Sequence, residues 1–194
     1  MNGLHDEPDD ATPLTAEERE ELIPSHVTLR CELNELEQQN ILDADTWVFA
    51  RKRDPLNESF ARGLHRRMFG KVWRWAGAYR KSNKNIGVDH DQIQHRLYEA
   101  FDNVKYWIEH KTFPPDEITV KFHHALVFIH PFPNGNGRWS RLMADILAVR
   151  LGQPRFSWGR SSLRAADETR RAYIEALRAA DNHDFASLIV FARS

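Results

Sequence analysis

The centre of this 194-residue sequence contains a segment that reads Ile129-His130-Pro131-Phe132-Pro133-Asn134-Gly135-Asn136-Gly137-Arg138-Trp139-Ser140-Arg141. Apolar residues recur at helical spacing on both sides of it: Ile118, Phe122 and Leu126 before, and Leu142, Ile146 and Val149 after. Pro131 lacks a backbone donor and disfavours helical geometry in the residue before it, so the first helix is predicted to end at His130. A turn over Gly135 to Arg138 is predicted to open the second helix.

This turn has the residues of an anion site. A helix N-terminus offers unpaired amide donors and a partial positive charge. Gly135 and Gly137 allow the backbone to approach an anion closely. Arg138 and Arg141 are three residues apart, so both guanidinium groups are expected on one side of the helix, where they can bind phosphate oxygens. With His130 as a candidate base, the pattern indicates transfer of a phosphorus-centred group.

The spacing of residues in the segment argues against several other kinds of site. No third glycine stands at Ser140 and the preceding pattern is helical, which excludes the dinucleotide-binding fingerprint, and no Walker Lys-Ser/Thr pair follows. A single histidine beside a turn is more often structural than catalytic. His123 and His124 could suggest a metal site with His130, but residues seven apart do not form a helical ligand pair, so packing roles are expected.

The complete segment resembles the signature of the Fic family, His-x-Phe-x-Asp/Glu-Gly-Asn-Gly-Arg-x-x-Arg. Every defined position matches except Asn134, where the family usually has a carboxylate. The resemblance extends over about residues 56–150 and includes the run Phe69-Gly70 to Trp75-Ala76-Gly77. It implies a mainly α fold, a Fic-type helical bundle with a small β-hairpin, and places the motif at the junction of two central helices.

The resemblance also implies an activity, the transfer of AMP from ATP to a Ser, Thr or Tyr hydroxyl of a target protein. His130 would accept the hydroxyl proton. Residues Gly135, Asn136 and Gly137 would hold the α-phosphate, and Arg138 and Arg141 the β- and γ-phosphates. Mg²⁺ is the implied cofactor, and Asn134 is expected to bind it weakly because magnesium prefers charged oxygens. Relatives that phosphorylate their targets carry lysine at the position of Gly137, so glycine favours nucleotidyl transfer.

An inhibitory role is implied for a glutamate near the N-terminus. Many Fic proteins carry a helix with the pattern Ser/Thr-x-x-x-Glu-Gly/Asn, whose glutamate pairs with the second motif arginine. Thr28 and Glu32 match this pattern, although the residue after Glu32 does not. Glu32 would then pair with Arg141 and block productive nucleotide binding. Because Glu35 and Glu37 crowd the same helix, a chance match is the alternative.

Residues 79–88 have the composition of an exposed turn or hairpin. Fic proteins have a β-hairpin, the flap, in this place, and it holds the target as an added strand. The resemblance assigns the flap to Ser82, Asn83, Lys84, Asn85, Ile86, Gly87 and Val88. A plain solvated loop is the alternative.

Composition limits the partners and the compartment. Lys plus Arg is 27 and Asp plus Glu is 28, so the net charge of −1 gives no global attraction to nucleic acid or acidic membranes. The sequence has no membrane-spanning run and no secretory signal. Cys31 is the only cysteine, which excludes an internal disulfide and suits a reducing compartment, so a cytoplasmic location is expected.

Three segments are predicted along the chain: a flexible tail over residues 1–14, N-terminal helices over 15–42 and the core domain over 43–194. Thr15 to Glu18 forms a capping-box pattern. Ser25 is predicted to cap a helix that runs to about Asn40, and Asp43 or Asp45 to cap another.

The sequence is compatible with three functions. The first is the AMP-transferring enzyme, with ATP and a protein as partners and a toxin-antitoxin-like role among those considered. The second is a non-catalytic nucleotide-binding or interaction module of the same fold. The third is a nucleic-acid binder that uses the basic region 155–171, where Phe156 and Trp158 are interleaved. The near-neutral net charge argues against the third, and the sequence specifies no oligomeric state.

Overall fold

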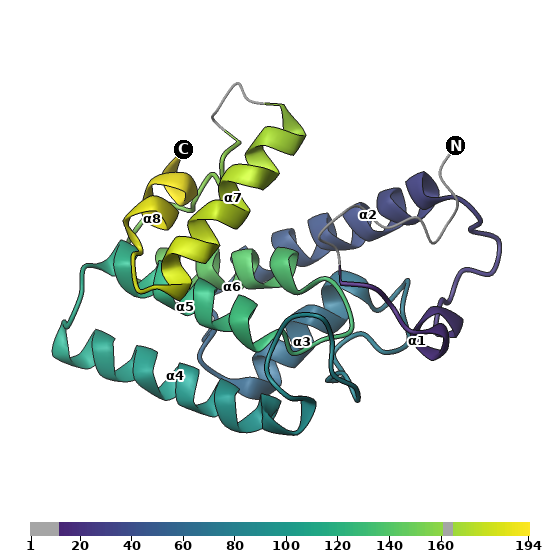
Figure 1. Ribbon diagram of the computed structural model, residues 1–194, viewed down its shortest axis with the longest axis horizontal. Coiled ribbons are helices and arrows are strands. Elements are labelled where there is room, and N and C mark those ends of the chain that lie inside the picture. Colours follow the sequence, from purple (N-terminus) through teal and green to yellow (C-terminus); the bar gives the residue numbers. More distant parts are fainter. Residues whose placement is uncertain (1–11, 161–164) are drawn as a thin grey trace.

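A computed structural model describes residues 12–160 and 165–194, and it is built from helices (Figure 1). Their bounds are α1 Ala16–Glu20, α2 Arg30–Phe49, α3 Glu58–Phe69, a short 3-10 helix His90–Gln92, α4 Ile93–His110, α5 Pro115–Ile129, α6 Asn136–Arg150, α7 Ala166–Asp181 and α8 Ala186–Arg193. Within these residues no helix is both long and apolar enough to cross a membrane.

Helices α5 and α6 lie side by side at the centre of the molecule (Figure 1). Helix α4 packs on α5, and α6 also contacts α3 and α2. Helices α7 and α8 pack on each other, and α8 reaches α5. The loop between α5 and α6 is therefore surrounded by other helices, which fixes its position.

The buried apolar residues form two clusters that meet at α6. The larger cluster includes Phe132, Trp139 and Met143, all of which are fully buried. The smaller one joins Ala144 and Ala148 of α6 to the following group from α5, the loop after α6, and α7 and α8: Val120, Phe156, Trp158, Tyr173, Ala176, Ala180, Leu188, Phe191 and Ala192. One face of α6 thus supports the main core and another face supports the C-terminal helices.

The main features expected around the motif are confirmed. Helix α5 ends at Ile129 with His130 as its C-cap, and α6 begins at Asn136 after Gly135. The Thr15 hydroxyl and the Glu18 carboxylate form the predicted capping box of α1. The fold class, mainly α, is also as predicted.

The predicted break between two N-terminal helices is wrong, because α2 is one continuous helix from Arg30 to Phe49. Asp43 and Asp45, expected as N-caps, lie inside it and pair with Lys71 and Arg155 instead. The two carboxylates bind cationic side chains from other parts of the chain, so they do not accept hydrogen bonds from backbone amides at the start of a helix. The domain boundary expected between residues 42 and 43 consequently falls within α2. Of the flexible tail expected over residues 1–14, residues 1–11 lie outside the described part of the chain, and the rest is not a free tail, because Thr12 and Leu14 are buried.

The hairpin predicted over Ser82 to Val88 is not formed as paired strands. An isolated antiparallel bridge joins Leu22 to Trp73, outside the expected flap. In the expected flap, the Arg80 guanidinium donates to the carbonyls of Ser82, at 2.9 Å, and of Val88. A side chain therefore closes this loop where a ladder of backbone hydrogen bonds was expected.

Candidate functional site

The loop between α5 and α6 is held by two buried side chains. Asn136 closes it on itself, since its Oδ1 accepts from Phe132 N at 2.9 Å and its Nδ2 donates to Phe132 O at 2.8 Å. His65 of α3 stacks on the Phe132 ring with the centroids 3.7 Å apart. Its Nδ1 accepts from Gly77 N at 3.0 Å, so its Nε2 carries the proton and donates to Asn134 O at 3.1 Å. Asn136 was expected to bind phosphate, but both polar atoms of its side chain are used inside the loop.

His130 stands at the end of α5 in a left-handed backbone conformation, with φ of 52°. Non-glycine residues seldom adopt this conformation, and such strain occurs often at functional sites. The Arg80 Nε donates to His130 O at 2.7 Å and fixes the strained backbone. A Cβ added at Gly87 would come within 2.7 Å of His130 Cβ, so the expected flap packs directly against this residue.

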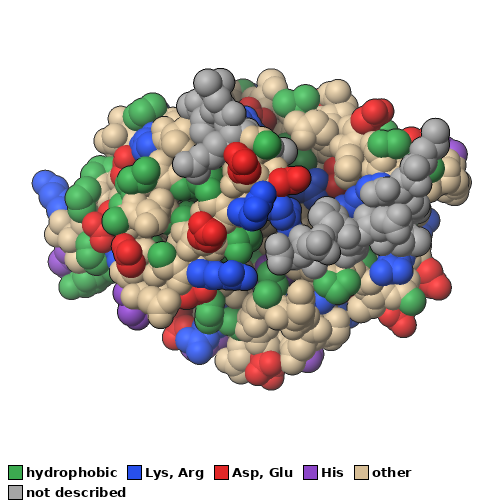
Figure 2. Space-filling view, turned by 45° about the horizontal axis from the view of Figure 1, so that its top comes forward, with side chains coloured by type: hydrophobic (Ala, Val, Ile, Leu, Met, Phe, Trp, Pro, Cys, Tyr) green, Lys and Arg blue, Asp and Glu red, His purple; other side chains and the backbone are tan. Residues whose placement is uncertain are grey.

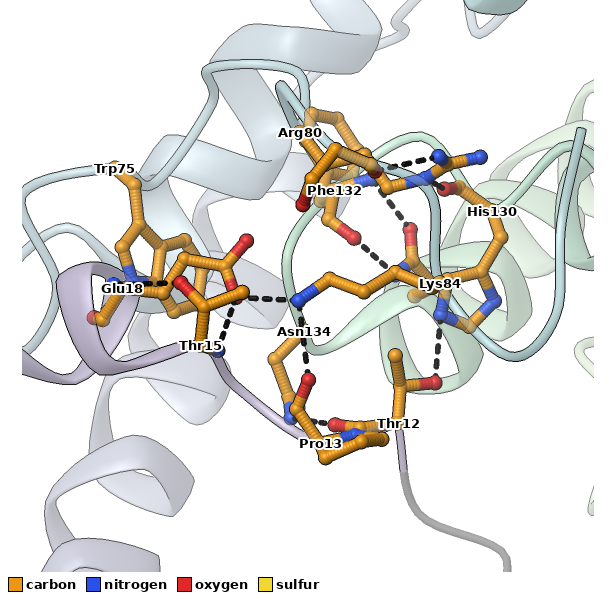
Figure 3. Close-up of polar contacts among 12 residues, drawn as sticks. Thr12, Pro13, Thr15, Glu18, Trp75, Arg80, Lys84, His130, Phe132 and Asn134 are labelled. Carbon is orange, nitrogen blue, oxygen red and sulfur yellow. Dashed lines mark hydrogen bonds and ion pairs between the residues drawn. The ribbon is translucent and has the colours of Figure 1, made fainter. Parts of the chain in front are cut away.

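The His130 ring is 7% exposed, and its Nε2 lies 3.0 Å from the Thr12 hydroxyl (Figure 3). Burial lowers its pKa to about 4, with Arg80 and Lys84 acting in the same direction. The ring is therefore neutral at pH 7. When the ring proton is on Nδ1, Nε2 is free to accept a proton from a hydroxyl group.

A cavity of about 540 Å³ opens beside His130. The loop and α6 line it, together with Arg30 and Asn34 of α2, Ile86 of the expected flap and Thr169 and Tyr173 of α7. All of the predicted phosphate-binding positions belong to its wall: Gly135, Asn136, Gly137, Arg138 and Arg141. Figure 2 shows Lys and Arg side chains gathered near the middle of one face of the molecule, beside acidic ones.

The two glycines of the turn have different roles. Gly135 has φ of 79°, and a Cβ there would lie 2.6 Å from the Phe69 ring, so packing and backbone both require glycine. Around Gly137 an added Cβ would meet nothing within 4 Å. Gly137 thus leaves open space in the cavity at the N-terminus of α6, where anions bind favourably.

Arg138 already has an anionic partner. Its Nη1 donates to Glu37 Oε2 at 2.6 Å, and its guanidinium lies 4.8 Å from the centre of the Phe69 ring. The buried Glu37 also accepts a hydrogen bond at 2.7 Å from Trp73 Nε1. Helix α2 thus supplies a carboxylate that neutralises the first motif arginine.

Arg141 lies over the Tyr173 ring, 5.4 Å from its centre. Burial lowers its pKa, and the nearby Arg138 and Arg160 add to this effect. Within the described part of the chain, no carboxylate forms an ion pair with it. A bound anion would relieve this unfavourable charge.

Glu32 does not occupy the place expected for it. It is exposed, and its Oε2 accepts from Thr28 N at 3.1 Å and Leu29 N at 3.2 Å, which caps the start of α2. The ion pair between α2 and α6 uses Glu37 and Arg138 instead. The prediction that Glu32 pairs with Arg141 is therefore wrong. The Glu32 carboxylate binds backbone amides at the start of α2 instead.

Asn134, the expected metal ligand, lies at the edge of the cavity. Its Oδ1 accepts from Gly135 N at 2.6 Å, and its Nδ2 donates to Thr12 O at 3.3 Å. Among the described residues, no three His, Cys, Asp or Glu side chains come together to hold a metal ion. The protein thus offers a magnesium ion one neutral oxygen, which a backbone amide already uses.

Several residues of the expected flap are used within the protein itself. Lys84 Nζ donates to Pro13 O at 3.0 Å and pairs with Glu18. Asn83 bonds to Asp89 at 2.8 Å through its Nδ2 and accepts from His90 N at 2.9 Å. These contacts stabilise the loop and attach it to the N-terminal segment.

The other two histidines of α5 have packing roles. The buried His123 lies 3.0 Å from the Tyr173 hydroxyl through Nε2, and its ring is 4.5 Å from that of Trp158. His124 pairs with Asp181 at 2.8 Å. Both histidines thus connect α5 to the C-terminal helices.

The basic region 155–171 does not present the surface expected of a nucleic-acid binder, in the part that the structure describes. Phe156 and Trp158 are buried in the smaller core cluster. Arg155 pairs with Asp45 and with the buried Asp145. Residues 161–164 lie outside the described part.

Sequence reasoning missed several residues of the site: Thr12, Glu37, His65, Arg80 and Tyr173. One signal was available for Glu37. It lies in the stripe of α2 that faces the core, with Leu33, Asn40, Ala44 and Val48, and a carboxylate on a buried face needs a partner. No local pattern marks Thr12, which meets His130 across 118 positions of sequence.

Comparison with known proteins agrees with this geometry. Residues 55–148 match the model of the Fic/DOC family. The chain is 34% identical over 95 residues to the protein adenylyltransferase Fic of Aedes aegypti, a match that covers 47% of this chain and 19% of that protein. The chain thus spans about a fifth of the length of the curated relatives it matches.

Two solved structures have the same fold. The N-terminal Fic domain of an effector protein from Bartonella sp. AR 15-3 has a TM-score of 0.71 at 18% identity, over 92% of this chain and 91% of that one. An N-terminal Fic domain from Bartonella quintana, solved with bound ADP, has a TM-score of 0.69 at 17% identity, over 91% and 94%. Residues 55–148 of this chain thus match the Fic/DOC family, and the chain shares the fold of these Fic domains.

Proposed function

We propose that this chain transfers AMP from ATP to a hydroxyl side chain of a protein. One observation carries the proposal: the neutral His130 ring and the amide end of α6 line the same cavity. A base and an anion site in one cavity are what nucleotidyl transfer to an alcohol needs. The name of the Aedes aegypti relative and the ADP in the Bartonella quintana domain support the choice of nucleotide and reaction.

His130 Nε2 would accept the proton of the attacking hydroxyl. Burial keeps the ring neutral at pH 7, so Nε2 can accept a proton in the tautomer that carries the ring proton on Nδ1, and Arg80 fixes the backbone of His130. The oxygen would attack the α-phosphorus, and pyrophosphate would leave with the electron pair of the broken bond.

The first turn of α6 would bind the phosphates. The open side of Gly137 allows close approach of an oxygen to the backbone amides, which stabilise developing charge. Arg141 has no carboxylate partner among the described residues, so it is free to bind a phosphate. Arg138 would have to exchange Glu37 for phosphate.

Magnesium is proposed as part of the substrate, MgATP. The residues that the structure describes contain no cluster of His, Cys, Asp or Glu that could hold a resident metal ion, and Asn134 contributes only an amide oxygen. Phosphate oxygens and water supply most ligands in such complexes.

The direct test uses ATP labelled at either the α- or the γ-phosphate, added to the protein in a cell lysate. Nucleotidyl transfer attaches the α-label and releases the γ-label, whereas a kinase does the opposite. Nucleotide binding without attachment of either label would support the non-catalytic module and refute the proposal.

Replacing Asn134 by aspartate should lower the magnesium concentration needed for half-maximal transfer. A full charge near the ion adds about 1 kcal/mol of attraction, or roughly five-fold in affinity. A magnesium titration of labelling measures this effect. An unchanged titration would show that position 134 does not contact the ion.

The two glycines of the turn provide a matched pair of variants. Gly135→Ala should destabilise the protein by about 3 kcal/mol, because it combines a positive φ with overlap on Phe69. Gly137→Ala should fold with equal or slightly higher stability but bind ATP at least several-fold more weakly, since its methyl group projects into the cavity. Urea unfolding and calorimetric titration with ATP separate the two effects. Equal ATP affinities of wild type and Gly137→Ala would contradict the assigned phosphate site.

Glu37→Gln should increase ATP affinity, because it releases Arg138 while keeping an acceptor for Trp73 Nε1. We expect ATP affinity to rise roughly five-fold, which corresponds to about 1 kcal/mol, because Glu37 no longer competes with phosphate for Arg138. Glu32→Gln is the matched control, since glutamine still caps α2 and the affinity should not change. An effect of the Glu32 variant alone would restore the inhibitory role expected for that residue.

A further inference from the structure

A hydroxyl group that contacts the ring of the proposed base belongs to the chain's own N-terminal segment. Thr12 is 7% exposed, lines the cavity, and places its hydroxyl oxygen 3.0 Å from His130 Nε2 (Figure 3). This is the distance required between a nucleophile and its base. Threonine is also one of the alcohols that the proposed reaction would modify.

The backbone of this segment is held on both sides of the cavity mouth. Asn134 Nδ2, from the motif loop, donates to Thr12 O at 3.3 Å. Lys84 Nζ, from the expected flap, donates to Pro13 O at 3.0 Å (Figure 3). The loop and the motif therefore hold the segment between them, as they would hold a bound peptide.

Helix α1 anchors the other end of the segment. The Lys84 ammonium also pairs with Glu18, which lies in the first turn of α1. The carbonyl of Glu18 accepts from Trp75 Nε1 at 3.1 Å, and the buried Leu14 joins the main core cluster. Thr12 is consequently fixed in position by contacts that do not involve its own side chain.

We propose that Thr12 is a self-modification site, whose hydroxyl group receives AMP from ATP bound in the same molecule. The proposal rests on the proposed function. In the step, Thr12 Oγ1 forms a bond to the α-phosphorus and its proton passes to His130 Nε2. The bond from the α-phosphorus to the bridging oxygen breaks, and pyrophosphate leaves with that electron pair. The products are AMP-threonine and pyrophosphate, and no other reactant is consumed.

The chemistry also predicts a consequence for activity. AMP attached to Thr12 would place a charged nucleotide at the mouth of the cavity, where other hydroxyl groups must enter. Unmodified Thr12 already occupies the position beside His130 that another hydroxyl would need, and the attached nucleotide would add to this block.

The test uses the 194-residue chain with MgATP labelled at the α-phosphate, followed by tryptic digestion and mass spectrometry. The peptide that ends at Arg19 contains two hydroxyl residues, Thr12 and Thr15. We expect the label on Thr12, its loss in Thr12→Val and its return in Thr12→Ser. Thr15→Asn is the matched control, because asparagine replaces the capping hydroxyl of α1 and the label should remain.

Dilution distinguishes transfer within one molecule from transfer between molecules. The fraction of labelled chains per minute should stay constant when the protein is diluted, and an inactive His130→Asn chain should remain unlabelled when mixed with wild type. Label on lysate proteins without label on Thr12 would overturn this inference and leave the proposed function intact. Absence of label from all proteins would overturn both.

Discussion

Replacing His130 with asparagine is expected to reduce AMP transfer by roughly 10²–10⁴-fold, the usual contribution of a positioned base. Asparagine tolerates the left-handed backbone that this position requires, so the loop should keep its shape. Its side chain cannot accept a proton at neutral pH. The initial rate of label incorporation from α-labelled ATP gives the direct measurement.

Two controls make this result specific. ATP affinity should change little, because the anion site consists of α6 amides and arginines, and the melting temperature should remain within a few degrees. His130→Ala should lose the same activity but be less stable, since alanine in the left-handed region costs about 1 kcal/mol more. Transfer at a near-normal rate in the asparagine variant would mean that another group takes the proton.

Acidification below pH 6.5 is expected to unfold the protein steeply. Burial lowers the pKa of both His65 and His123 to about 3, against an ordinary value of 6.5. Both rings are neutral in the folded state and become charged on unfolding, so the unfolded state binds more protons between pH 6.5 and 3. Each residue should then remove about 2 kcal/mol of stability between pH 7 and 5, and His130, whose pKa burial lowers to about 4, should remove about as much, or about 6 kcal/mol for the three together. This is a large part of the 5–15 kcal/mol of a typical domain.

Urea unfolding curves between pH 7.5 and 4.5 measure this dependence. His123→Gln provides the comparison, because glutamine can still bond to the Tyr173 hydroxyl and does not titrate. The slope of stability against pH should fall by about a third in this variant, because His65 and His130 still titrate on unfolding, although its stability at pH 7 will also change. A wild-type curve that stays flat down to pH 5 would be incompatible with two neutral buried imidazoles.

The sequence predicted best what depends on neighbouring residues. The end of α5 at Ile129 follows from Pro131, and the start of α6 follows from Gly135. The placement of the candidate base beside the anion site followed from these two boundaries. The motif is local, so local rules were sufficient for it.

Tertiary contacts determined what the sequence did not predict. Asp45 was expected to cap a helix, but Arg155, 110 positions away, pairs with it inside α2. Arg80 closes the loop that was expected to pair as strands. Glu32 matched an inhibitory pattern by spacing alone, whereas the buried face of α2 presents Glu37 to the motif. The Thr12 contact could not be inferred from spacing, because it depends on the completed fold.

Helix α6 contributes residues to both apolar clusters. A fragment that folds alone must therefore contain the residues that cover both faces of this helix. The family match ends at residue 148, yet Val120, Ala144 and Ala148 are covered by side chains that come later, including Tyr173 and Phe191. A fragment cut at the end of that match would expose this apolar surface to water and aggregate. Experiments on an isolated catalytic module should therefore retain both C-terminal helices, although neither carries a motif residue.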